Sequence, residues 1–296
     1  MTDLAAPVDL VESLGQDPNS SWRLVINAVY QQQLQSAGLR GFQDFYDPRH
    51  GTLIKKIKER SVCRCEIAGT VFFLKKHDRE KQQKKGLRPS SSPVWQSEGG
   101  KEFVYFYDFR RHNLATAVPV AMGERVYGDG TVDSFFLTED FSPYVQLEEL
   151  IRNQPERLAG RPHALLRKNI LRAVAAYAGK MHASGFNHLD FNATHVLLAN
   201  VDSGAPAIAL FDLQRIDTNT LGRFRWPVKA LAEFNYSSRE NGVFSDSERF
   251  FLFQAYLGKE GQSLNLFERL IWGWIEAKTE RIAHHTDRRR ARKKVS

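Results

Sequence analysis

Long apolar runs are missing from this 296-residue sequence. No stretch approaches the roughly 18 consecutive apolar residues that a helix needs to cross a bilayer, so we expect no transmembrane segment. The first residues, Met1-Thr2-Asp3-Leu4, lack the basic and apolar regions of a secretory signal. We therefore expect a cytoplasmic protein.

Cysteine is scarce, since Cys63 and Cys65 are the only two. Residues two apart on a strand point to the same face, which is a poor geometry for a disulfide. No further ligand cluster accompanies them, as a zinc site would require. We expect two reduced, partly buried thiols, and a disulfide-stapled or zinc-stabilised fold is not expected.

Basic charge is spread unevenly along the chain. The net charge is +8, and the run Arg288–Lys294 carries six of the basic residues, so the remainder is close to neutral. A terminal basic run is typical of a solvated tail, a nucleic-acid arm or an anchor to anionic lipid headgroups. Because a nucleic-acid-binding domain needs a basic face on its folded part, this distribution does not favour a nucleic-acid partner.

The first part of the chain is rich in expected strands. Residues 1–20 have the composition of a loosely ordered lead-in, and a helix is expected over Trp22–Ala37. The polar stretch Arg79–Gly100 is interpreted as a loop. Alternation and turn residues predict strands over Thr52–Ile57, Ser61–Ile67, Val71–His77, Val118–Arg125 and Ser134–Glu139, and helical spacing predicts a helix over Lys101–His112.

Beyond Thr138–Phe141 the pattern becomes mainly helical. The predicted helices are Val145–Arg152, Pro162–Ser184, Val228–Phe234, Asp246–Leu257 and Leu264–His284, with a strand pair over Val196–Ala199 and Ala207–Phe211. A strand-rich half followed by a helical half indicates an α+β fold of two lobes. A cleft between two such lobes is a common place for a ligand.

Three polar side chains stand at the ends of the predicted strand pair. Asp190 and His195 precede its first strand, and Asp212 follows its second. Because a hairpin brings these ends together, we expect the three to converge. Phosphoryl transfer uses one carboxylate to accept the proton of the attacking hydroxyl and another to hold Mg²⁺. Mg²⁺ prefers oxygen ligands, so Asp212 is the natural metal residue.

A second group of residues lies upstream. Lys75 ends the apolar stretch Phe72-Phe73-Leu74, and Glu102 lies on the next predicted helix. In two-lobed kinases a strand lysine contacts the α- and β-phosphates and is held by a helix glutamate. Strand alternation lets only one of Lys75 and Lys76 face the cleft, and the sequence register favours Lys75.

These residues resemble the protein-kinase superfamily and, more closely, the bacterial lipopolysaccharide core kinases, which act on heptose or Kdo (3-deoxy-manno-octulosonic acid). The resemblance covers roughly residues 40–285 and includes the segments Phe135–Asp140, Asn187–Leu198 and Phe211–Arg215. His195 stands where protein kinases carry Asn, and Asp-Leu-x-Arg replaces their Asp-Phe-Gly.

The resemblance implies a two-lobed, protein-kinase-like fold with an antiparallel sheet in the N-lobe and a mainly helical C-lobe. The corresponding division is an N-terminal extension over 1–40, a nucleotide-gripping N-lobe over 41–140, a catalytic C-lobe over 141–285 and a basic tail over 286–296.

The resemblance also implies how ATP is bound. Lys75 would contact the α- and β-phosphates, and Glu102 would pair with Lys75. The backbone of Glu139 and Phe141 would meet the adenine.

For catalysis, the resemblance implies that Asp190 is the base and that Asp212 binds Mg²⁺. The role of His195 stays open. Imidazole is a poor ligand for Mg²⁺, so this residue would reach the metal through water or brace the loop.

The sequence departs from the protein-kinase pattern at several places. No G-x-G-x-x-G is present, and Lys55–Arg60 stands in its place. We hypothesise that basic side chains there supply the charge that glycine amides supply elsewhere. Asn192 stands where many protein kinases have a Lys. The positive charge near the transferred phosphoryl group would then come from Arg215. Ala230 replaces an Asp that we expect to brace the catalytic loop.

Few residues follow Asp212 and no Ala-Pro-Glu appears, which favours a small or lipid-linked acceptor over a protein. The resemblance implies a kinase that uses ATP and Mg²⁺ on the lipopolysaccharide core, or its lipid-linked precursor, in a Gram-negative bacterium. Peripheral contact with the inner face of the cytoplasmic membrane goes with this interpretation. One alternative is a pseudokinase that binds a nucleotide or a partner. Another is a small-molecule kinase of the aminoglycoside or choline type.

Overall fold

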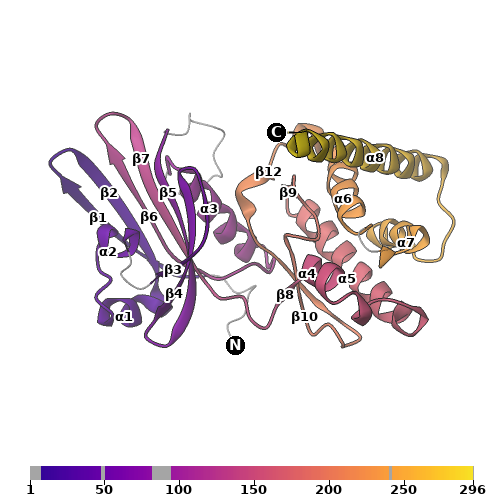
Figure 1. Ribbon diagram of the computed structural model, residues 1–296, viewed down its shortest axis with the longest axis horizontal. Helices are drawn as coiled ribbons and strands as arrows, with labels where there is room; N and C mark the ends of the chain where they lie inside the picture. Colours follow the sequence, from indigo (N-terminus) through magenta and orange to yellow (C-terminus); the bar gives the residue numbers. More distant parts are fainter. Residues whose placement is uncertain (1–7, 48–50, 82–94, 240–241, 296) are drawn as a thin grey trace. The chain divides into compact units, whose positions relative to one another are not determined.

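The chain divides into two compact units, Met1–Phe141 and Ser142–Ser296. The computed structural model describes residues 8–47, 51–81, 95–239 and 242–295 (Figure 1). Most of the expected polar loop Arg79–Gly100 lies outside these residues. Among the described residues, no helix has the length and apolar character needed to cross a membrane.

The first unit is built on a seven-stranded antiparallel sheet with the order β1-β2-β6-β7-β5-β4-β3 (Figure 1). Its strands are β1 (Leu10–Asp17), β2 (Ser20–Asn27), β3 (Gly51–Ile57), β4 (Arg60–Ile67), β5 (Thr70–Lys81), β6 (Pro119–Tyr127) and β7 (Thr131–Glu139). Strands β3 to β7 lie where the sequence predicted strands. Cys63 and Cys65 of β4 are free thiols, and Cys65 is buried, as expected.

Helices cover both faces of this sheet. They are α1 (Ala28–Ser36), α2 (Phe42–Tyr46) and α3 (Glu98–Arg111). Phe45 of α2 stacks on Phe135 with ring centroids 5.2 Å apart, whereas Phe106 of α3 meets Phe136 edge-on at 4.9 Å. Because neighbouring residues of a strand point to opposite faces, α2 and α3 lie on opposite sides of β7.

The beginning of the chain differs from the prediction. Residues 10–17 form β1 rather than a loose lead-in, and the helix expected over Trp22–Ala37 is divided into β2 and α1. Leu24 and Ile26 of β2 are buried, and the residues around them pair with β6. This tertiary pairing outweighs the helical periodicity of the segment. Asn27 then caps α1 by accepting a hydrogen bond from the Val29 N–H. The expected N-terminal extension therefore contributes two strands to the sheet.

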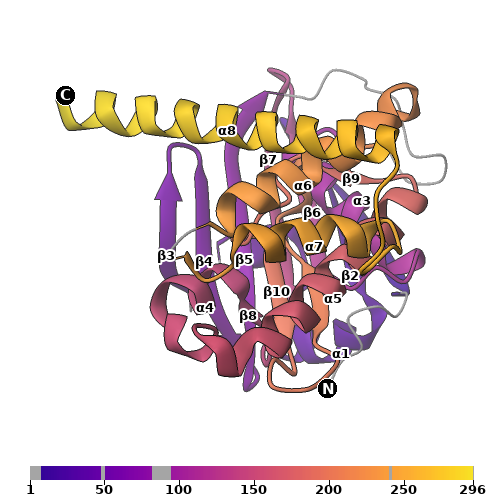
Figure 2. The same cartoon turned by 90° about the vertical axis from the view of Figure 1, so that its right-hand side faces the viewer.

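The second unit is mainly helical (Figure 2). Its helices are α4 (Leu147–Asn153), α5 (Ala164–Ala183), α6 (Trp226–Ser237), α7 (Asp246–Tyr256) and α8 (Leu266–Val295). Two small sheets accompany them, one formed by β8 (Val145–Gln146), β10 (Val196–Ala199) and β11 (Ala207–Leu210), the other by β9 (Asn187–His188) and β12 (Ile216–Asp217). The predicted helix Pro162–Ser184 is confirmed as α5.

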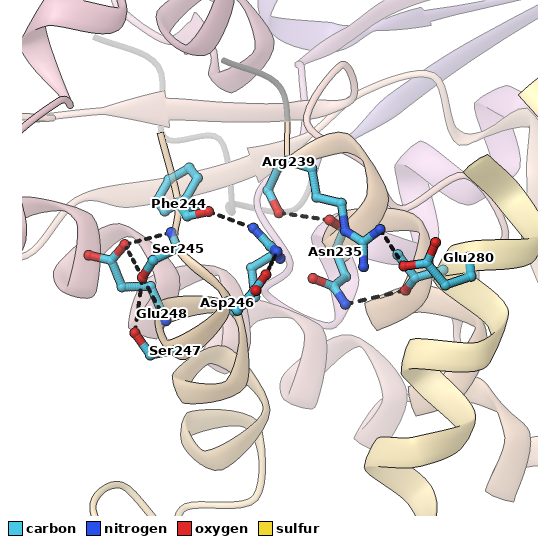
Figure 3. Close-up of polar contacts among 11 residues, drawn as sticks. Asn235, Arg239, Phe244, Ser245, Asp246, Ser247, Glu248 and Glu280 are labelled. Carbon is cyan, nitrogen blue, oxygen red and sulfur yellow. Dashed lines mark hydrogen bonds and ion pairs between the residues drawn. The ribbon is translucent and has the colours of Figure 1, made fainter. Parts of the chain in front are cut away.

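Polar contacts join the end of α6 to the middle of α8, and a separate set caps the start of α7 (Figure 3). Arg239, just after α6, donates a hydrogen bond to Glu280 of α8 at 2.6 Å, and Asn235 donates to Thr279 at 3.3 Å. At the start of α7, Ser245 and Glu248 form a capping box. These contacts fix α8 against the end of α6.

Helix α8 also extends further than predicted. The sequence interpretation ended a helix at His284 and treated 286–296 as a tail, but the backbone stays helical through Val295. Arg, Lys and Ala are good helix formers, and basic residues near a helix C-terminus interact favourably with its dipole. The basic run is therefore part of α8.

Candidate active site

In the first unit, a buried ion pair joins β5 to α3. The Lys75 Nζ lies 2.8 Å and 2.9 Å from the two carboxylate oxygens of Glu102. The Glu102 side chain is 1% exposed and that of Lys75 is 23% exposed. A carboxylate this deeply buried requires a charged partner, so Glu102 holds the ammonium group at a defined, partly accessible position.

The neighbouring lysine points the other way. The Lys76 Nζ lies over the Tyr46 ring, 4.3 Å from its centroid. Because successive strand residues alternate, Lys75 and Lys76 face opposite sides of β5. The sequence register therefore selected the lysine that pairs with Glu102.

The segment that ends the first unit is held against the sheet. The Glu139 N–H donates to the Val118 carbonyl at 3.0 Å, and the Asp140 N–H donates to the Val71 carbonyl at 3.1 Å. The Phe141 ring stacks on Phe73 with centroids 5.8 Å apart. The backbone at Glu139 and Phe141 is thus fixed by contacts on both sides of it.

The β3–β4 hairpin occupies the edge of the sheet. All residues of β3 are exposed, including Lys55 and Lys56, and the turn residue Lys58 has a positive φ of 53°. A strand exposed along its whole length gains little from the core, so its residues are available to contact something other than the sheet.

In the second unit, one buried histidine links the two acidic residues that the sequence singled out. His188 is fully buried in β9. Its Nδ1 accepts a hydrogen bond from the Asp190 N–H at 3.1 Å, so its Nε2 carries the proton and donates to the Asp212 carbonyl at 3.1 Å. Burial lowers the pKa of His188 to about 4. The neutral ring therefore fixes the backbones of Asp190 and Asp212 relative to each other.

Asp212 itself has an unusual backbone conformation. Its φ of 58° and ψ of 61° place it in the left-handed region, which Asp tolerates better than most residues other than glycine. Strain of this kind is typically found at functional sites. The conformation turns the chain sharply between β11 and β12.

His195 stands between the two acids. Its Nδ1 donates to the Asp190 carbonyl at 2.9 Å, and its Nε2 lies 3.8 Å from the Asp212 Oδ2. The Nε2 of the ring therefore lies on the Asp212 side. Both interpretations of His195 from the sequence remain compatible with this geometry, because the ring braces the loop and also lies beside the carboxylate.

Asp212 and His195 are the side chains at this place that could hold a metal ion. The part of the chain that the structure describes contains no group of three or more His, Cys, Asp and Glu residues able to hold an ion. Mg²⁺ commonly takes one or two protein carboxylates and completes its shell with water and substrate phosphates. Asp212 with His195 beside it is therefore suited to an ion that arrives with a nucleotide.

Three arginines follow Asp212. Arg215 Nη1 donates to the Asp190 Oδ1 at 2.6 Å while its side chain remains 62% exposed. Arg223 donates to the His182 carbonyl at 3.1 Å, and Arg225 is exposed. Arg215 therefore positions the Asp190 carboxylate, a contact that the sequence did not predict.

A serine that sequence reasoning missed secures the loop. The Ala193 N–H donates to the Ser237 Oγ at 2.9 Å, and the Ser237 hydroxyl donates to the Phe234 carbonyl at 3.0 Å. Ala230, where we expected an Asp brace, is fully buried on the same helix. No sequence signal singles out a serine at the end of a helix, so this contact could be found only in the structure.

Comparison with known proteins identifies relatives whose sequences align with most of this chain. The model of the Lipopolysaccharide kinase (Kdo/WaaP) family matches residues 49–256. The lipopolysaccharide core heptose(I) kinase WaaP of Pseudomonas aeruginosa is 28% identical over 244 residues, covering 80% of this chain and 88% of the relative. The Escherichia coli protein of the same name is 28% identical over 245 residues, covering 81% and 90%.

A solved structure shares the fold. It is described as WaaP in complex with acyl carrier protein, and it superposes with a TM-score of 0.63 at 24% identity. The match covers 88% of this chain and 98% of that chain. The antiparallel sheet of the first unit and the helical second unit are thus the two parts of a known architecture.

Proposed function

The chain belongs to the Lipopolysaccharide kinase (Kdo/WaaP) family and has its two-lobed, protein-kinase-like fold, and we propose that it phosphorylates a heptose of the lipopolysaccharide inner core. The family is a kinase family, so the chain uses ATP and, as is typical of kinases, a divalent metal ion. We propose that the ion is Mg²⁺. Relatives that are named heptose(I) kinases favour heptose over Kdo as the acceptor.

One observation carries the assignment of the catalytic group. Asp190 and Asp212 are joined through the buried ring of His188, and Arg215 holds the Asp190 Oδ1. We assign proton acceptance from the sugar hydroxyl to the Asp190 Oδ2. Arg215 orients this carboxylate. Phosphoryl transfer is accelerated largely by the correct positioning of the reacting groups, so such an orientation fits the reaction.

We assign the direct contacts with the nucleotide to residues of the first unit. We propose that Lys75, fixed by Glu102, contacts the α- and β-phosphates and that the backbone of Glu139 and Phe141 meets the adenine. Asp212 would hold the metal ion, which neutralises charge on the phosphates when bound. This division makes the first unit the nucleotide-gripping lobe and the second the catalytic lobe.

The basic edge hairpin supports a further part of the proposal. Lys55 and Lys58 take the place of the glycine-rich loop that covers the phosphates in protein kinases. Lys55 on the exposed strand β3 and Lys58 in the turn that follows it are both exposed, which supports a contact with phosphate. The Arg215 side chain is 62% exposed. It would supply positive charge to the transferred phosphoryl group, because Asn192 replaces the lysine that does so in protein kinases.

We propose that the acceptor is the lipopolysaccharide core or its lipid-linked precursor. The enzyme would work in the cytoplasm, peripherally at the inner face of the cytoplasmic membrane. No nucleic-acid partner is proposed.

The experiment follows transfer of labelled phosphate from ATP to lipopolysaccharide core that lacks inner-core phosphate. We expect Asp190→Asn to lower kcat by about a thousandfold, as loss of a positioned general base does. Asp202→Asn is the matched control, because Asp202 is an exposed carboxylate in a turn of the same unit and pairs with Arg157. Unchanged kcat in Asp190→Asn would overturn the assignment.

Two other outcomes would identify the alternative functions. Nucleotide binding without any phosphate transfer would indicate a pseudokinase. Transfer to an aminoglycoside or choline, and none to the core sugar, would indicate a small-molecule kinase. The Ser237 contact weakens the case for a pseudokinase, because Ala230 suggested an unbraced loop and Ser237 secures the loop to α6.

A further inference from the structure

Helix α8 carries a stripe of large apolar side chains that the rest of the protein leaves exposed. Leu266, Phe267, Leu270 and Trp274 are 76%, 66%, 53% and 52% exposed. Positions 266, 270 and 274 repeat every four residues, and position 267 lies beside them, so all four share one face of the helix. A contiguous apolar patch of this kind on a protein surface marks an interaction site.

The stripe is not the face that holds α8 in the fold. Ile275 and Thr279 are fully buried, and the Thr279 hydroxyl donates to the Ile275 carbonyl within the helix. Trp272 packs against Phe250 and Phe253 of α7. At 100° per residue these three positions lie on the opposite side of the helix from Leu270 and Trp274. The exposed face is therefore additional to the one used for packing.

The same exposed face becomes basic toward the C-terminus. Continuing the helical spacing from Leu270 and Trp274 leads to Arg281 and Arg288, both exposed. His284 and His285 lie on the same side and are also exposed. The described face thus has an apolar half followed by a half rich in Arg and His.

Acidic side chains are confined to other sides of α8. Between Leu266 and Arg288, in the described part of the helix, no Asp or Glu falls on the exposed face. The acidic residues of this stretch are Glu268, Glu276, Glu280 and Asp287. Two of them are engaged within the fold, Glu268 with Lys259 and Glu280 with Arg239.

We propose that this face of α8 lies on an anionic lipid surface. Leu and aromatic side chains on one face, with Lys and Arg beside them, are typical of helices that lie in the membrane interface, where Trp is also enriched. A face without carboxylates is complementary to negative headgroups, and the basic residues of 288–294 add to the attraction. The 30-residue helix is about 45 Å long, so its two halves contact the surface together.

The inference extends the proposed peripheral location by naming the surface that contacts the membrane. It rests on that location and not on the kinase chemistry. Binding to vesicles is measured without ATP or acceptor, so it stays readable if no phosphate transfer is found. An acidic protein or a second copy of the chain is the competing occupant of the face.

The experiment measures sedimentation of the full chain with phosphatidylcholine vesicles that contain or lack phosphatidylglycerol. We expect Leu266→Gln with Leu270→Gln to lower binding to the anionic vesicles by about tenfold or more. The matched control is Leu14→Gln with Leu165→Gln, because these leucines are 72% and 69% exposed on other elements. The control should bind as the wild type does.

A second pair tests the basic half. Arg281→Gln with Arg288→Gln should weaken binding only when phosphatidylglycerol is present, whereas Arg40→Gln with Arg64→Gln, exposed residues of the other unit, should have little effect. Transfer of phosphate to a deacylated, water-soluble core should be equal in all four variants, which shows that they are folded.

Vesicle binding by the α8 variants equal to that of the wild type would overturn the proposal. So would a wild-type dimer that the Leu266→Gln, Leu270→Gln variant converts to a monomer without any change in vesicle binding. In that case the face is a contact between two copies of the chain.

Discussion

At the scale of single residues, His188 shows how a neutral ring organises a charged site. Its two nitrogens bond to the backbone at Asp190 and Asp212, and its burial keeps it unprotonated, with a pKa lowered to about 4. A protonated ring would donate from both nitrogens, and the Asp190 N–H would lose its acceptor. The site therefore depends on a histidine that does not titrate at neutral pH in the folded protein.

A pH dependence of stability follows from the same burial. His182 and His188 have pKa values lowered from 6.5 to about 4, chiefly by desolvation. Between pH 6.5 and pH 4 these histidines are protonated in the unfolded chain but remain neutral in the folded chain. The free energy of unfolding therefore falls as pH falls. Each histidine contributes up to about 3 kcal/mol, present above pH 6.5 and lost toward pH 4.

We expect urea unfolding midpoints to fall between pH 7.5 and pH 5. The variant His188→Asn should be less stable at pH 7.5 but show a shallower decline, because one of the two buried rings is gone. The exposed His285→Asn is the control and should decline as the wild type does. A decline in His188→Asn as steep as that of the wild type would contradict this account.

The sequence indicates which residues are charged or polar at the site but not how the backbone holds them. Lys75 and Glu102 can be paired from the order of strand and helix, and the structure contains that pair. The part played by His188 depends on the carbonyl of Asp212, a group that every residue possesses. Nothing in the pattern distinguishes that carbonyl, so the sequence does not reveal that His188 joins the two acids.

At the scale of elements, α6 supports the loop that carries Asp190. The Ala193 N–H reaches the Ser237 Oγ near the end of this helix. We expect Ser237→Ala to destabilise the protein by about 1–3 kcal/mol, because a partly buried N–H is left without an acceptor. It should also lower kcat by about tenfold while the KM for ATP changes little, since the loop and not the nucleotide is displaced.

The control for this prediction is Ser238→Ala. Its hydroxyl donates to the Asn235 carbonyl within the same helix and is fully buried, but it has no bond to the loop. Steady-state kinetics and thermal unfolding are measured for both variants. Ser238→Ala loses only a contact to the helix, whereas Ser237→Ala also loses the contact to the loop. Equal kcat values in the two variants would show that Ser237 does not position the loop.

Element boundaries were predictable where local pattern and tertiary pairing agree. Helix α5, with its continuous apolar stripe, and the hairpin β10–β11 lie where the sequence placed them. Strand β2 was wrongly expected to be helical, because its hydrogen-bonded partners are strands β1 and β6 on its two sides. Periodicity in one segment does not report partners that are distant in sequence.

At the scale of the whole molecule, the chain divides into two compact units, and proteins of more than one such unit commonly depart from a single two-state unfolding transition. The sequence predicted both the strand-rich and the helical half, because composition and period change near residue 140. It did not show that residues 10–17 and 20–27 form two strands of the sheet. Their contribution has a direct consequence for the stability of the first unit.

Leu24→Ala should loosen the first unit and leave the second unchanged. Leu24 is fully buried in β2 and pairs with Gly123 of β6, so truncation leaves a cavity that costs about 3 kcal/mol. We expect faster amide hydrogen exchange in β6 and β7, and unchanged exchange in α5 and α6. Leu14→Ala, at a position 72% exposed on the neighbouring β1, should change neither. Equal acceleration in both units would mean that the two cores unfold together, and no change in β6 would mean that β2 is not needed to hold the sheet.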